Sequence, residues 1–105
     1  MIEINEKNHD RMLSDSQYVI IKFSAPWCGP CRRLKPTVEK IEQNHKDVVF
    51  CEANTDDCQD MAVKYRVSAV PTLVFIKFGN PVPSLTLAGI PSEIHIERHI
   101  GELMK

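Results

Sequence analysis

The sequence has no long apolar run and no cluster of charge of one sign. Its 105 residues include 13 Lys and Arg against 14 Asp and Glu, for a net charge of -1. No stretch of five or six basic residues occurs, and no aromatic residues alternate with Lys and Arg, as they often do in nucleic-acid-binding proteins. The longest apolar runs fall far short of the roughly 20 residues that span a bilayer. We therefore expect neither nucleic acid nor a membrane as a partner.

The N-terminal residues also lack the pattern of a secretory signal. Residues 1–5 read Met-Ile-Glu-Ile-Asn, without a basic segment followed by an apolar one. This absence predicts a cytoplasmic protein. No linker, internal repeat or low-complexity segment interrupts the chain, and its length suffices for one hydrophobic core but not for two. We expect a single domain over residues 1–105 that acts as a monomer.

The four cysteines are not spaced as in a zinc site. Only Cys28 and Cys31 form a Cys-x-x-Cys pair, whereas six residues separate Cys51 from Cys58. A four-cysteine zinc site usually has a second close pair. Cys51 falls in a predicted buried strand, where a free cysteine acts as a small apolar side chain. Cys58, near a predicted helix start, is open to a structural role or to an exposed, oxidisable one.

Residues 27–31, Trp-Cys-Gly-Pro-Cys, have the residue types needed for thiol chemistry. Cysteines at i and i+3 in the first turn of a helix direct both sulfurs to the same side and can form a disulfide. The free N–H groups and the positive end of the helix dipole stabilise a thiolate there. Pro30 suits a first helical turn, and Gly29 lets a partner chain approach closely. The segment therefore predicts a redox-active pair.

The surrounding pattern predicts a βαβ unit. The apolar run 18–23 is typical of a strand buried on both faces, and it leads directly to the cysteines. A helix is expected over about 28–44, with Leu34, Val38 and Ile41 on its apolar side. The run 48–53 predicts a second strand, parallel to the first and reached by a right-handed crossover.

The remaining segments complete an α/β protein. We expect an edge strand at 2–4, a helix that starts near residues 8–10, and a short helix capped by Asp56 or Asp57. A central strand at 72–78 is followed by an edge strand at 84–88 that nearby prolines guard against further pairing, and then by a helix over 92–104. The prediction is a central mixed β-sheet of about five strands flanked by four helices.

Three motifs together resemble the thioredoxin family. They are the Trp-Cys-Gly-Pro-Cys segment after a strand, Pro36 five residues beyond the second cysteine, and Val-Pro-Thr at 70–72 before a strand and hairpin. The resemblance covers nearly the whole chain and implies the thioredoxin fold.

The resemblance also implies a role for each cysteine. Cys28 is expected to attack a disulfide of a client protein, and Cys31 to resolve the mixed disulfide that forms. The redox-active group is then the Cys28–Cys31 disulfide itself, with no bound cofactor and no metal. The expected partners are disulfide-containing client proteins and a thioredoxin reductase that draws electrons from NADPH.

Seven further residues are expected, by resemblance, to form the surface that clients contact. Trp27 would cover the sulfur pair, and Val70 would offer its backbone to a client strand next to a cis peptide bond. The full set is Trp27, Gly29, Pro30, Val70, Pro71, Gly89 and Ile90.

Two positions depart from the family pattern. Most members have a buried aspartate six residues before the first cysteine, which helps to take the proton from the resolving thiol, and a lysine on the neighbouring strand. Here these positions hold Lys22 and Glu52. In one interpretation they form a buried pair beneath the disulfide, and Glu52 or a desolvated Lys22 accepts the proton of Cys31. In the other, Lys22 extends to solvent and water alone accepts the proton.

Three functions stay open at this point. The leading hypothesis is a general protein-disulfide reductase. The alternatives are a dedicated redox carrier for one client enzyme and a non-catalytic binding module, against which the intact Cys-Gly-Pro-Cys argues. Arg32 and Arg33, next to the thiols, indicate either a solvated helix face or a preference for acidic partners.

Overall fold

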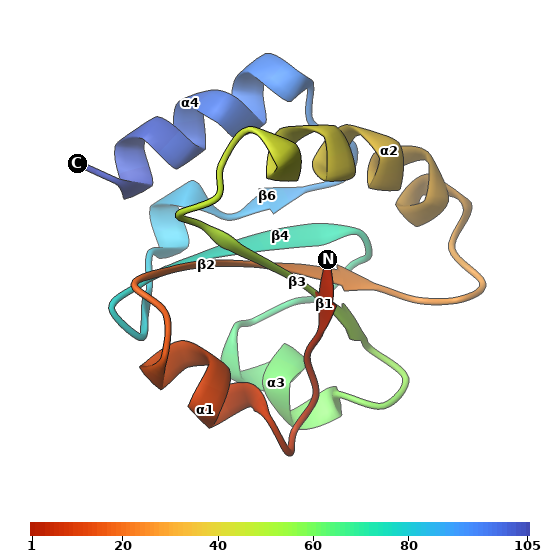
Figure 1. The fold of residues 1–105 in the computed structure, drawn as a ribbon. Helices are drawn as coiled ribbons and strands as arrows, with labels where there is room; N and C mark the ends of the chain where they lie inside the picture. The colour runs from red at the N-terminus through yellow and green to blue at the C-terminus, as the bar shows by residue number, and fades with distance from the viewer.

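Six strands form one mixed sheet in the computed structural model, which describes residues 1–105 (Figure 1). The strands are β1 (Ile2–Glu3), β2 (Tyr18–Ser24), β3 (Val49–Asn54), β4 (Thr72–Lys77), β5 (Asn80–Pro81) and β6 (Leu87–Ala88). Their order is β1-β3-β2-β4-β5, with β6 also paired to β4. Strand β3 is parallel to β1 and β2, whereas β4 is antiparallel to β2. The expected mixed sheet and the parallel βαβ unit are confirmed.

Four helices cover the two faces of this sheet. They are α1 (His9–Ser14), α2 (Gly29–Gln43), α3 (Gln59–Lys64) and α4 (Glu93–Leu103). Figure 1 shows α2 and α4 on one face and α1 and α3 on the other. Each face has its own core of 12 buried residues.

Strand β2 is buried on both sides because it lies in the middle of the sheet. Val19, Ile21 and Phe23 belong to the core cluster that contains residues of α1 and α3. Ile20 belongs to the cluster beneath α2 and α4. The strand therefore ends, at Ser24, between two packed layers and holds the segment that follows it in a fixed position.

Helix α2 begins directly after this segment. Cys28 is its N-cap, and Pro30 lies in the first turn, where its missing N–H costs no hydrogen bond. Leu34, Val38 and Ile41 are buried against the sheet, as their spacing predicts. The predicted and observed helix ends agree within one residue.

Only the last two residues of the expected edge strand over 84–88 form a strand. The chain instead forms β5, one 3₁₀ turn at Pro83–Leu85, and then β6. The N–H of Val82 donates to the Phe75 carbonyl at 2.8 Å. Pro83, which follows, has no N–H and has a fixed φ, so it cannot continue a strand ladder. The chain turns there and returns to the sheet for only two residues.

The expected cap of α3 by Asp56 or Asp57 is also wrong. Cys58 is the N-cap, and its side chain makes no capping hydrogen bond. Cys58 is buried, with its thiol directed toward the Ile4 carbonyl at 3.8 Å. The exposed, oxidisable role considered for this cysteine is therefore excluded in the folded state.

A buried polar network that the sequence pattern does not reveal joins α1 to the end of α3. The imidazole of His9 is buried, and its Nε2 lies 2.5 Å from the hydroxyl of Tyr65. Its Nδ1 lies 2.8 Å from an oxygen of Asp10. Since a carboxylate only accepts, we assign the proton to Nδ1 and the Tyr65 hydroxyl as donor to Nε2. The bond to His9 lowers the pKa of Asp10, and burial raises the pKa of Tyr65 to about 12.

Replacing Tyr65 by Phe should destabilise the protein by about 1–2 kcal/mol, because the buried Nε2 of His9 loses its donor. Urea unfolding measures the change. The matched control is Tyr18→Phe, whose hydroxyl accepts only from the exposed amide of Gln17. The control should cost less than about 0.5 kcal/mol. Equal losses in the two variants would show that the His9–Tyr65 bond adds no stability.

The two core cysteines should be unreactive in the folded protein. Burial raises the pKa of Cys51 to about 11 and also raises the pKa of Cys58. Both stay neutral thiols at pH 8, and only a thiolate reacts readily with iodoacetamide. The folded pKa of Cys51 exceeds its reference value of 9.0. The neutral thiol of Cys51 therefore favours the folded state below pH 9.0, and this stabilisation is lost as the pH rises toward 11.

Peptide mapping after iodoacetamide treatment of the oxidised protein tests this expectation. Neither Cys51 nor Cys58 should be labelled in the native protein, and both should be labelled after unfolding in guanidinium. Fast labelling of Cys58 before unfolding would contradict the assigned burial.

Candidate redox site at the start of helix α2

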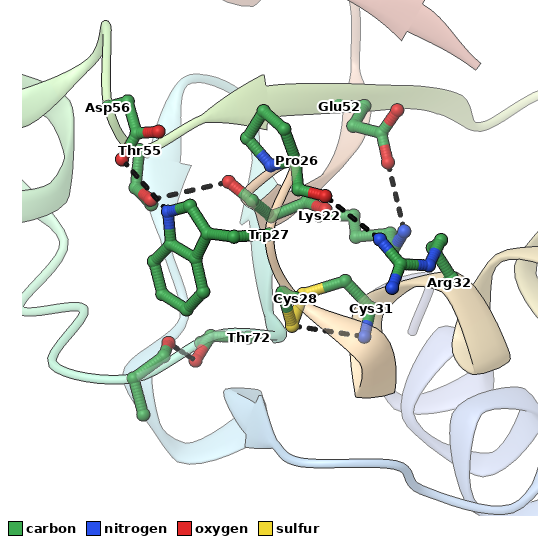
Figure 2. The surroundings of a disulfide bond; sticks show 12 residues. Lys22, Pro26, Trp27, Cys28, Cys31, Arg32, Glu52, Thr55, Asp56 and Thr72 are labelled. Atoms are coloured by element: carbon green, nitrogen blue, oxygen red, sulfur yellow. Dashed lines mark hydrogen bonds and ion pairs between the residues drawn. A yellow bond between two sulfur atoms is a disulfide. The ribbon is translucent and has the colours of Figure 1, made fainter.

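Cys28 and Cys31 form a disulfide in the turn between β2 and α2 (Figure 2). Their Cα atoms lie 5.3 Å apart. The N–H of Cys28 donates to the Ala25 carbonyl at 3.1 Å, which folds the connection between strand and helix into a tight turn. Cys28 is 4% exposed and Cys31 is 1% exposed. The pair therefore lies at the surface end of β2, with the second sulfur deeper than the first.

The two sulfurs have different surroundings. The backbone N–H of Cys31 donates to the Cys28 sulfur at 3.1 Å, so Cys28 acts as the N-cap of α2 with its own side chain. The free N–H groups and the positive end of a helix stabilise negative charge at the N-cap position. When the disulfide is reduced, this arrangement favours a thiolate on Cys28.

Trp27 covers one side of the pair. Its side chain is exposed, with 67% of the residue accessible, and its Nε1 donates to Asp56 at 3.4 Å. Figure 2 shows the indole ring next to Cys28, between the disulfide and the β3–α3 loop. Sequence reasoning considered Asp56 only as a helix cap, because the contact with Trp27 spans 29 residues.

The other residues expected on the client surface meet at the same place. Val70 packs against Ala25, Cys28 and Cys31. The Val70–Pro71 peptide bond is cis, as the resemblance implies. The N–H of Gly89 donates to the Pro71 carbonyl at 2.9 Å, which holds the loop with the exposed Ile90 beside this bond.

Lys22 and Glu52 form an ion pair beneath the site. Their side chains are joined by a 2.9 Å contact from the Lys22 Nζ to the Glu52 Oε2. They are direct partners in the parallel register of β2 and β3, so both point to the α2 side of the sheet. The side chain of Lys22 is 1% exposed and that of Glu52 is 32% exposed. The predicted pairing is confirmed, and the alternative in which Lys22 extends to solvent is wrong.

One cavity connects this ion pair with the resolving cysteine. It has a volume of about 400 Å³ and is lined by Lys22, Glu52 and Cys31, together with Glu3 and Arg32. Arg32 lies at its rim, where its Nη1 donates to the Pro26 carbonyl at 2.9 Å. Figure 2 shows Lys22, Glu52 and Arg32 on the side of the disulfide opposite Trp27. The ion pair and Cys31 therefore border one common space.

Other kinds of site are not supported by the geometry. No three His, Cys, Asp or Glu side chains come close enough together to bind a metal ion. None of the four helices is both long enough and apolar enough to cross a bilayer.

Comparison with known sequences gives a consistent result. The thioredoxin family model matches residues 1–100. The mitochondrial thioredoxin of Mus musculus is 38% identical over 96 residues, which cover 90% of this chain but 57% of the mouse protein. The chain thus spans little more than half the length of that relative. Thioredoxin of Ovis aries is 38% identical over 86 residues, or 82% of this chain and 79% of the sheep protein.

The fold is shared with solved structures. The oxidised mitochondrial thioredoxin 3 of Saccharomyces cerevisiae superimposes with a TM-score of 0.88 at 28% identity, and the match covers 98% of this chain and 95% of the yeast chain. The mixed sheet and the four helices are therefore those of the thioredoxin fold.

These relatives contradict the expected cytoplasmic location. Besides the mitochondrial mouse protein, a chloroplastic M-type thioredoxin of Triticum aestivum is 34% identical over 96% of this chain and 60% of its own length. The expectation was wrong because it rested only on the composition of residues 1–5. The mitochondrial and chloroplastic relatives match the same sheet and redox site, so these parts of the sequence do not indicate the compartment.

The disulfide at the N-terminus of α2, the cis bond beside it and the match over residues 1–100 lead to one assignment. The chain belongs to the thioredoxin family.

Proposed function

We propose that this chain is a protein-disulfide reductase that acts as one domain over residues 1–105. The observation that carries the proposal is the hydrogen bond from the Cys31 N–H to the Cys28 sulfur. It makes the two cysteines chemically unequal, as a nucleophile and a resolving thiol need to be. The surface formed by Trp27, Val70, Pro71, Gly89 and Ile90, together with Gly29 and Pro30 in the turn, would hold the client segment.

The reaction proceeds in two thiol-disulfide exchanges. The Cys28 thiolate attacks one sulfur of a client disulfide, so that an S–S bond to Cys28 forms and the second client sulfur leaves as a thiolate. Cys31 then loses its proton, and its thiolate attacks the Cys28 sulfur. The mixed disulfide breaks, the client leaves as a dithiol, and the Cys28–Cys31 disulfide forms. The client gains two electrons and this chain loses them.

A separate donor has to return the two electrons. We propose a thioredoxin reductase that draws on NADPH, as the family membership suggests. NADPH would bind to that reductase, and this chain would take part only through its disulfide.

We further propose that Glu52 accepts the proton of Cys31. Glu52 and Cys31 line the same cavity, and its volume of about 400 Å³ leaves room for water between them. Lys22 holds the carboxylate in place through the 2.9 Å contact. Lys22 is then a positioning residue. The arrangement serves the step for which most family members use a buried aspartate on β2.

Reduction of insulin disulfides, driven by NADPH and a generic thioredoxin reductase, tests the main proposal. The wild-type protein should reduce insulin, and Cys28→Ser should be inactive because the attacking sulfur is absent. Cys31→Ser should accumulate a mixed disulfide with the client, visible by mass spectrometry as an adduct that added dithiol removes. Activity with dithiothreitol but not with the generic reductase would instead indicate a dedicated carrier. No reduction with either donor would contradict the proposal.

Replacing Glu52 by Gln should slow the resolving step by about 10- to 100-fold at neutral pH, because a general base is removed. Gln keeps an oxygen that can accept from Lys22. The resolving step is measured in a single turnover. The reduced protein is labelled at Cys28 as a mixed disulfide with thionitrobenzoate, and the attack of Cys31 then releases thionitrobenzoate.

Glu3→Gln is the matched control. Glu3 is the register partner of Glu52 on β1 and borders the same cavity. The rate of the resolving step is measured as a function of pH in both variants. In the control, this pH dependence should match that of the wild-type protein. An unchanged profile in Glu52→Gln would contradict the proton-acceptor role, even if the variant lowered stability.

A further inference from the structure

The first two turns of α2 carry three cationic side chains that form no ion pair. Arg32, Arg33 and Lys35 are exposed, and the first turn contains no acidic residue. None of the three takes part in any of the six ion pairs of the structure. A cation near a helix N-terminus opposes the helix dipole, typically by about 0.3–1 kcal/mol. Residues that are unfavourable for local structure are often found at functional sites, so these three cations indicate a functional role.

Both arginine side chains reach residues of the segment that contains Cys28. The Nη1 of Arg32 donates to the Pro26 carbonyl at 2.9 Å. The Arg33 side chain reaches back along the helix, and its Nη1 lies 3.7 Å from the position that a Cβ at Gly29 would occupy. Each guanidinium carries five N–H donors, and only one of those on Arg32 is used, by the Pro26 carbonyl.

On the Trp27 side of the site, the nearest charged side chain is an exposed carboxylate, that of Asp56. Asp56, which holds Trp27, is exposed, and so are Asp57 and Asp60 nearby in the chain. Figure 2 shows Arg32 and Asp56 on opposite sides of the cysteine pair. The chain as a whole has a net charge of only -1, so the separation is a local property of this surface.

We infer that Arg32 and Arg33 form a carboxylate-binding rim that selects client segments with Asp or Glu beside the reactive disulfide. The inference rests on the proposed reductase activity and specifies its substrate class. A guanidinium binds a carboxylate through paired hydrogen bonds, whereas a Lys or Arg at the same place in a client is repelled. If the arginines served only to stabilise the Cys28 thiolate, they would accelerate the reaction of every client equally.

Three peptides with the same disulfide test this selection. They differ only in the two residues that flank the attacked cysteine, which are Asp, Ser or Lys. The rate constant for their reduction by the pre-reduced protein is measured at about 20 mM and about 500 mM salt, which change the screening length several-fold. At low salt the Asp peptide should react on the order of 10-fold faster than the Lys peptide. At high salt the ratio should fall toward one.

Arg33→Glu should lower the Asp-to-Lys rate ratio by about 10-fold or more, because the sign of the local field changes. Glu complements the helix dipole at this position, so the variant should fold, and thermal unfolding verifies it. Lys46→Glu is the matched control, since Lys46 is exposed, unpaired and beyond the C-terminal end of α2. The control should leave the ratio within about twofold of wild type.

Two results would overturn the inference. One is a wild-type ratio near one at low salt, and the other is an Arg33→Glu variant that slows all three peptides equally. Either result leaves the proposed reductase function intact. Failure to reduce any of the peptides would instead count against the proposed function itself.

Discussion

The hydrogen bond from the Cys31 N–H to the Cys28 sulfur is the interaction on which the chemistry of this molecule depends. Strand β2 is buried on both faces and ends at Ser24, and α2 begins at Gly29. This short connection puts Cys28 at the N-cap position, where its sulfur meets the Cys31 N–H. The sulfur of Cys28 then replaces the oxygen that usually caps a helix and receives the same stabilisation of negative charge. Two identical side chains, three residues apart, thus acquire different roles from the backbone alone.

The layer beneath the disulfide follows from the register of two strands. Lys22 lies opposite Glu52, and an ammonium that is 1% exposed would be strongly destabilising without that carboxylate. The carboxylate keeps contact with the cavity that reaches Cys31. The ion pair therefore provides a charge partner for a buried lysine and, in our proposal, a proton acceptor for the resolving thiol. Arg32, at the start of α2, borders the same cavity and lies exposed at its rim.

Periodic features of the sequence predicted the fold well, whereas long-range polar contacts left no periodic signal. The apolar run 18–23 identified β2, since such a run needs cover on both faces. The strand predicted at 84–88 forms only over its last two residues, because Pro83 starts a 3₁₀ turn just before it. His9 and Tyr65 are 56 residues apart, so no local pattern links them. The Lys22–Glu52 pair was predicted because resemblance placed both residues beneath the disulfide.

The central claim is that Cys28, and not Cys31, carries the reactive thiolate. Competitive alkylation of the fully reduced protein with limiting iodoacetamide at pH 7, followed by peptide mapping, measures this directly. Modification of Cys28 should be at least about 10-fold faster than that of Cys31, because alkylation follows the thiolate population and exposure. Equal rates, or faster modification of Cys31, would contradict the assignment of attack and resolution.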